Sequence, residues 1–131
     1  MSKLPFAVTV ARLLIGLNAL IWLGFGLIVA SGAHPAMPDS SILRGMMAIL
    51  GLLTAAALLV LNVFLGRRSR LAFIAAIVVL GCLAFLTIAD QVGLVDAAVL
   101  ALTLAPLVCL IGSRGWFMAG GTSTPDANRG G

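Results

Sequence analysis

The chain has 131 residues, of which 62% are hydrophobic and 9% are charged, and its mean hydropathy is +1.21. Soluble domains carry about 25% charged residues, so a soluble fold of this composition would expose large apolar patches and aggregate. The net charge of +4 does not indicate nucleic-acid binding, because the basic residues separate apolar runs and no aromatic residues lie between them to stack on bases. Composition therefore favours a membrane protein.

The first apolar run covers residues 6–30 and contains only two strongly polar side chains, Arg12 and Asn18. About 20 helical residues cross 30 Å of hydrocarbon, so this run predicts one membrane-spanning helix. A cleaved signal peptide has an apolar core of about 7–15 residues, which is much shorter. We therefore expect the run to remain in the protein as a span.

Three further apolar runs follow, at residues 42–65, 71–89 and about 95–113. A loop rich in Gly, Pro and Ser, "SGAHPAMPDSS", precedes the second run, and Asp39, Ser40 or Ser41 could cap its first turn. The second and third runs are separated only by "GRRSR", which predicts a tight helical hairpin.

These runs predict an all-α, polytopic membrane protein with four transmembrane helices in an antiparallel up-down bundle. Runs of this length without alternating polarity indicate helices and not barrel strands, because helices satisfy their backbone groups internally in lipid. We expect residues 1–117 to form the transmembrane domain. The polar, Gly-rich residues 118–131 are expected to be a disordered cytoplasmic tail.

Basic residues indicate how the chain is threaded. With four crossings, both termini and the middle hairpin share one side, which carries Lys3, Arg12, Arg67, Arg68, Arg70, Arg114 and Arg129. Lys and Arg near helix ends are retained on the cytoplasmic side. The sequence therefore predicts cytoplasmic termini in a bacterial inner membrane, with Arg67, Arg68 and Arg70 as topological anchors.

Three polar residues fall inside the expected spans. Asn18 lies near the middle of the first helix, where an interhelical hydrogen bond is a better expectation than contact with a ligand. Arg12 can snorkel to the headgroups, or it can face inward and meet Asn62 at a similar depth. Of the two, snorkelling is the expectation.

A second group of polar residues is expected on the outer side. Arg44 could pair with Asp39, Asp90 or Asp96, and Gln91 lies beside them in the sequence. Such a rim ion pair would stabilise the fold modestly. The cluster of Arg44, Asp90, Gln91 and Asp96 is nevertheless the best candidate site in the sequence.

Other reactive side chains show no catalytic or metal-binding pattern. Cys82 and Cys109 lie inside apolar runs and form no CxxC pair, and His34 is the only histidine. One histidine cannot provide both axial haem ligands or a His-rich metal site. We expect no cofactor, no metal and no catalytic residue.

Small residues recur at four-residue spacing, which allows close approach of helix backbones. They are Gly26 and Ala30, Gly51 and Ala55, Ala72 and Ala76, and Ala97, Ala101 and Ala105. This spacing fits an oligomer interface, and it fits packing within one bundle equally well.

Two stretches carry a resemblance to a known group of proteins. "ARLLIGLNALIWLGFG" (residues 11–26) and, after the Pro-containing loop, "LRGMMAILGLL" (residues 43–53) resemble small bacterial four-helix membrane proteins that include DoxX-like families. This resemblance implies the four-helix architecture. DoxX-like proteins are linked with membrane redox assemblies, often as small accessory subunits.

The sequence thus leads to a non-catalytic integral membrane protein, an accessory or scaffold subunit in the bacterial inner membrane. Its partners would be the lipid bilayer and either copies of itself or another membrane protein. One alternative is a small transporter of a lipid-like or apolar substrate, because the absence of Glu and of any mid-helix Asp disfavours proton-coupled cation export. The other is a quinone-linked redox subunit, by family analogy alone.

Overall fold

The computed structural model describes residues 4–33, 40–89 and 93–119, and helices provide all the regular secondary structure within these residues. Four long helices follow one another along the chain: α1 (Phe6–Ser31), α2 (Ser41–Gly66), α3 (Arg70–Ala89) and α4 (Leu94–Gly112). Each is long and apolar enough to cross a membrane. The protein is therefore a multi-pass, all-α membrane protein.

The helix ends lie within one residue of the positions expected from the apolar runs. The hydroxyl of Ser40 accepts a hydrogen bond from the backbone N–H of Leu43 at 3.4 Å and so caps α2. Gly32 ends α1 with φ of +75°, a left-handed conformation that glycine adopts without steric cost. α4 continues through Pro106 without interruption.

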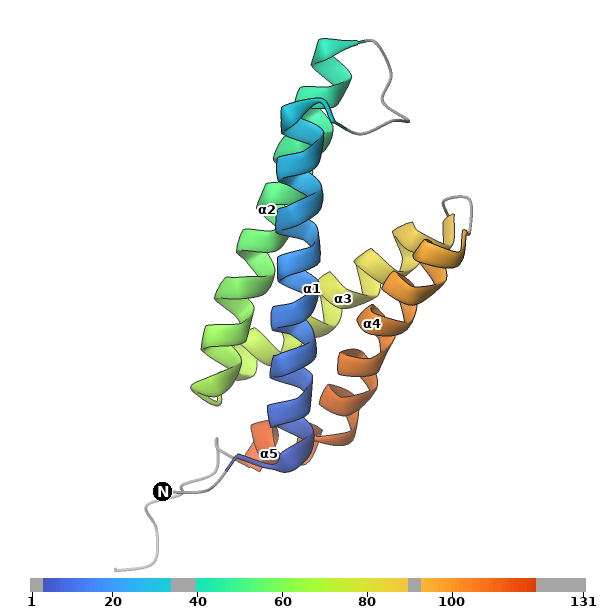
Figure 1. Ribbon diagram of the computed structural model, residues 1–131. Coiled ribbons are helices and arrows are strands. Elements are labelled where there is room, and N and C mark those ends of the chain that lie inside the picture. The colour runs from blue at the N-terminus through green and yellow to red at the C-terminus, as the bar shows by residue number, and fades with distance from the viewer. Residues whose placement is uncertain (1–3, 34–39, 90–92, 120–131) are drawn as a thin grey trace, which may run out of the picture.

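The helices form two antiparallel hairpins (Figure 1). α1 packs most extensively on α2 and also contacts α4, and α4 contacts α3. α2 and α3 are joined by a short turn, yet they make the smallest helix–helix contact of the four. Figure 1 shows why: the α3–α4 hairpin leans away from α1 and α2, so the bundle is closed at the α2–α3 turn and open at the opposite end.

The two hairpins also differ in length. α1 and α2 have 26 residues each, whereas α3 has 20 and α4 has 19. At 1.5 Å per residue the first pair is about 39 Å long and the second about 30 Å. Only the shorter pair matches the hydrocarbon thickness of about 30 Å, so the first hairpin must tilt or extend into the headgroup layer.

Glycine lets α1 and α2 approach closely. A Cβ added at Gly51 would lie 3.2 Å from the Cα of Gly26, and one at Gly26 would lie 3.1 Å from the backbone nitrogen of Leu52. Ala55, Ala72 and Ala76 are buried within the bundle as well. The small residues of α4 behave differently, since Ala97, Ala101 and Ala105 are all exposed.

A short fifth helix, α5 (Arg114–Met118), folds back beneath the bundle at its closed end (Figure 1). The ring of Phe117 is buried and stacks on Phe73 of α3, with ring centroids 4.7 Å apart. α5 ends at Met118 and Ala119 is its C-cap, so the described structure includes the first two residues of the expected tail. The remainder of the expected tail, residues 120–131, lies outside the described residues.

Candidate functional site

Arg12 faces inward. Its Nε donates to both the backbone oxygen and the side-chain Oδ1 of Asn62, each at 3.2 Å. The expectation that Arg12 snorkels to the headgroups was therefore wrong, and the reason is the space that glycine leaves beside it. A Cβ at Gly66 would lie 2.9 Å from the guanidinium carbon of Arg12, and one at Gly16 would lie 3.3 Å from the amide nitrogen of Asn62.

Asn18 makes an interhelical hydrogen bond of the expected kind. Its Nδ2 donates to the hydroxyl of Thr103 on α4 at 3.1 Å, and both side chains are buried. The Thr103 hydroxyl donates in turn to the backbone oxygen of Val99 at 2.8 Å, so it can only accept from Asn18. The amide oxygen of Asn18 has no hydrogen-bond partner among the described residues.

The three arginines of the α2–α3 turn differ in what they contact. Arg68 has a left-handed backbone with φ of +58°, donates through Nε to the backbone oxygen of Trp116 at 2.7 Å, and lies 4.9 Å from the indole centroid. Arg70 contacts the sulfur of Met118 at 3.3 Å. Arg67 lies over the ring of Phe64. Two of the three predicted anchors thus also hold α5 against the turn.

Two residues of the predicted outer cluster, Arg44 and Asp96, lie among the described residues, and they do not come together. The guanidinium of Arg44 lies at the end of α1, because a Cβ added at Gly32 would be 3.0 Å from its Nη1, and a cation at this position complements the helix dipole. Asp96 lies at the start of α4, which Figure 1 shows well apart from the start of α2. Asp90 and Gln91 are outside the described residues.

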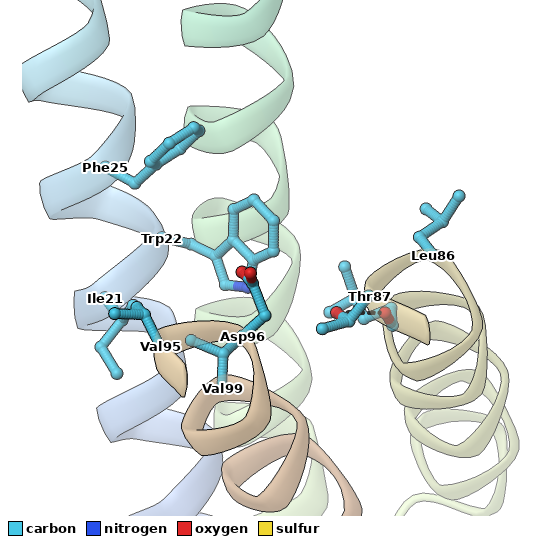
Figure 2. Close-up of a pocket in the computed structure, with 9 residues that line it drawn as sticks. Ile21, Trp22, Phe25, Leu86, Thr87, Val95, Asp96 and Val99 are labelled. Atoms are coloured by element: carbon cyan, nitrogen blue, oxygen red, sulfur yellow. Dashed lines mark hydrogen bonds between the residues drawn. The ribbon is translucent and has the colours of Figure 1, made fainter. Parts of the chain in front are cut away.

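Asp96 instead lines a cavity of about 410 Å³ between α1, α3 and α4. Figure 2 shows Trp22 of α1 and Asp96 of α4 extending towards one another, with Thr87 facing them from α3. Apolar side chains form most of the lining: Ile21, Phe25, Leu83, Leu86, Val95 and Val99. The volume falls within the range of about 300–1,000 Å³ that is typical of small-molecule sites.

Three polar groups reach this cavity. Oδ2 of Asp96 accepts a hydrogen bond from the backbone N–H of Gly93 at 3.0 Å, which caps α4. The Thr87 hydroxyl donates to the backbone oxygen of Leu83 at 2.8 Å. The indole Nε1 of Trp22 is buried and has no hydrogen-bond partner among the described residues. Trp22 and Phe25 also pack edge to face, with centroids 5.8 Å apart.

Sequence reasoning missed Trp22, Thr87 and Thr103 as functional candidates. Thr103 is invisible in the sequence because threonine is common in apolar helices and only its register against α1 brings it to Asn18. Trp22 does carry a signal, since it lies one helical turn after Asn18 and therefore on the same face of α1. Thr87 and Asp96 lie on the two helices of the second hairpin and line the cavity together with Trp22 of α1, and no local sequence pattern encodes how that hairpin is placed against α1.

Reactive side chains elsewhere form no constellation in the described residues. Cys82 and Cys109 are free thiols, the first exposed and the second half-buried. The described parts of the chain contain no group of three potential metal ligands. His34 lies outside them.

We compared the chain with known protein families, curated proteins and solved structures. No protein-family model, no curated protein and no solved structure matches it. The geometry of the bundle and its cavity therefore carries the functional argument alone.

Proposed function

We propose that the protein is a non-catalytic accessory or scaffold subunit of a bacterial inner-membrane assembly, with both termini in the cytoplasm. The observation that carries this proposal is the use made of polar side chains within the spans. Arg12 and Asn62 connect α1 to α2, and Asn18 and Thr103 connect α1 to α4. Polar groups in membrane helices commonly serve either chemistry or helix association, and here they hold the helices together.

The surface offered to a partner is the outward face of α4. Ala97, Ala101 and Ala105 are exposed, while Thr103, on the opposite side of the helix, is buried. Small side chains spaced by four residues let a second helix approach closely, and van der Waals packing then drives association in lipid. Most residues of the other small-residue pairs are buried in contacts between helices of the bundle. α4 is therefore the helix best suited to contact a partner.

Arginine placement supports the proposed orientation. The start of α1, α5 and the α2–α3 turn lie at the closed end of the bundle (Figure 1). Arg67, Arg68, Arg70 and Arg114 gather at that end. Such a concentration of cations is retained on the cytoplasmic side and attracts anionic headgroups.

The test is affinity purification from native expression levels in a mild detergent, followed by native gel electrophoresis. We expect recovery of a complex, either with another membrane protein or with further copies of the chain. Ala101→Phe should disperse this complex, whereas Ala57→Phe, at an exposed alanine of α2, should leave it intact. Recovery of a monomer alone, or equal effects of the two substitutions, would contradict the proposal.

One observation favours a second function. The cavity between α1, α3 and α4 has the size and apolar lining of a small-molecule site. A small carrier or receptor of a lipid-like substrate would need such a cavity, whereas a purely structural subunit would not. A flux assay in liposomes, comparing the intact protein with a Val99→Trp variant that fills the cavity, tests this alternative.

A further inference from the structure

The cavity contains a carboxylate that has no cationic partner among the described residues. Asp96 is the only acidic residue in the described parts of the chain, and its one hydrogen bond there comes from a backbone N–H. The described arginine on the outer side, Arg44, lies at the end of α1 and forms no ion pair with it. A carboxylate lining an apolar cavity is stabilised by a positive charge that enters that cavity.

Aromatic rings form the wall on the α1 side of the same cavity. Trp22 and Phe25 pack edge to face there, and Figure 2 shows the Trp22 indole extending towards Asp96 across the opening between α1 and α4. The faces of aromatic rings attract cations, tryptophan most strongly, and the attraction rises where water is excluded. Carboxylate and indole therefore favour the same ligand charge.

The rest of the lining sets the character of the remaining part of the ligand. Apart from Asp96, Thr87 and the indole nitrogen, the side chains around the cavity are aliphatic or aromatic. Thr87 donates its only hydroxyl proton to its own helix, so it offers the cavity only an acceptor. A small inorganic cation would leave most of this apolar lining without contacts, whereas an apolar body would fill it.

We propose that this cavity binds an organic cation with an apolar body, such as an alkylammonium amphiphile. The cationic head lies between the Asp96 carboxylate and the indole face of Trp22, and the apolar body packs on α3 and the start of α4. This inference goes beyond the accessory role and does not require it. It is a binding site and implies no proton-coupled transport.

The chain contains a convenient reporter of binding, because it has two tryptophans. Trp22 lines the cavity and Trp116 lies beside Arg68 at the closed end. The Trp116→Phe variant retains a ring at that position and leaves Trp22 as the only indole. This variant, in nanodiscs of phosphatidylglycerol, is titrated with octyltrimethylammonium and with its neutral isostere, in which a tert-butyl group replaces the trimethylammonium head.

We expect a saturable change in Trp22 emission with the cation, at a dissociation constant at least about tenfold lower than with the neutral isostere. Adding Asp96→Asn to the reporter variant should weaken cation binding by about tenfold or more, while the neutral isostere is unaffected. Asparagine can still accept the capping hydrogen bond from Gly93, so the fold should persist. Unchanged circular dichroism and thermal unfolding verify this.

The matched control is Trp22→Phe in the otherwise native chain, which leaves Trp116 as the reporter. Its emission should not respond, because Trp116 lies at the other end of the bundle. A second set of nanodiscs containing phosphatidylethanolamine separates two sources of the same chemistry. If phosphatidylethanolamine weakens binding of octyltrimethylammonium, the site accepts an ammonium lipid headgroup. If the affinity for octyltrimethylammonium is unchanged, the ligand is a free organic cation.

Three results would overturn the inference: equal affinity for the cation and the isostere, full cation affinity in the Asp96→Asn variant, or the same emission change from Trp116. The last would mean that the probe acts through the bilayer. None of these outcomes depends on the oligomeric state, so they are distinguishable from failure of the accessory function.

Discussion

The hydrogen bond between Asn18 and Thr103 leads to an asymmetric prediction. Thr103→Val removes the acceptor of the Asn18 amide, whose oxygen already has no partner, and leaves a fully buried amide without any hydrogen bond. Leaving a buried polar group unpaired costs about 1–3 kcal/mol, while hydrogen bonds between membrane helices contribute about 0.6 kcal/mol on average. We expect Thr103→Val to reduce the free energy of unfolding by about 1–2 kcal/mol.

Asn18→Leu should cost less than Thr103→Val. Leucine is close to asparagine in shape, and the remaining Thr103 hydroxyl keeps its hydrogen bond to the oxygen of Val99. Replacing both partners with apolar residues of similar shape is nearly neutral. The double variant should therefore be about as stable as Asn18→Leu alone, with a coupling energy of about 1 kcal/mol.

Equilibrium unfolding in mixed micelles, followed by tryptophan emission, measures these differences. Thr54→Val is the matched control, because Thr54 is half-buried on α2 and has no hydrogen bond to another helix in the described structure. It should change stability by less than about 0.5 kcal/mol. If Asn18→Leu proved more damaging than Thr103→Val, or if the two effects simply added, the pairing would not be the source of stability.

Three further predictions concern the closed end of the bundle. Gly66→Ala should destabilise the protein by about 1 kcal/mol, because its Cβ would lie 2.9 Å from the Arg12 guanidinium and would displace it from its hydrogen bonds to Asn62. Gly112→Ala, with open space around it, should be neutral or stabilising, and unfolding in mixed micelles compares the two variants. When fused after Arg70, a reporter enzyme that works only in the cytoplasm should be active, and one that works only in the periplasm should be inactive. Activity of the periplasmic reporter would refute the proposed orientation. Phe117→Ala should release α5 and speed its proteolysis several-fold at unchanged helix content, because its buried ring holds α5 on the bundle; an unchanged rate would show that other contacts hold it.

The sequence was sufficient to predict the four helices. The helix ends follow from hydropathy and from capping residues. Ser40 caps the start of α2 with its side chain, and Gly32 ends α1 with a left-handed backbone. Lipid forbids unpaired backbone groups, so the apolar runs had no alternative to helix. The fold class was therefore accessible from residues 6–113 without any knowledge of how the helices pack.

Positions that depend on packing were predicted less well. The expectation that Arg12 snorkels was based on its own helix alone. It took no account of two glycines at the same spacing: Gly16 lies four residues after Arg12, and Gly66 lies four residues after Asn62. Those two glycines create the room in which the pair meets. The paired pattern, a polar residue followed four residues later by glycine on both helices, is a signal that sequence analysis could use.

Arg44 and Asp96, the two described members of the predicted outer cluster, lie apart for a different reason. Grouping Arg44 with Asp96 assumed that all four helices end at one level. α1 and α2 are longer than α3 and α4 by about two turns. Arg44, in the first turn of α2, therefore lies farther along the bundle than Asp96, in the first turn of α4. Helix length was readable from the sequence, but the tilt of the second hairpin was not.

The position of the cavity follows from where the polar contacts lie. Arg12 with Asn62 and Arg68 with Trp116 hold the closed end together, and Asn18 with Thr103 joins α1 to α4 about halfway along α1. Beyond that level the close approach of Gly26 and Gly51 joins α1 to α2, which acts only within the first hairpin. Lipid tails are as apolar as the helix surfaces, so no hydrophobic force draws the second hairpin against the first. The hairpins therefore diverge just beyond the last polar contact, and the side chains at that level, Trp22 and Asp96, line the opening.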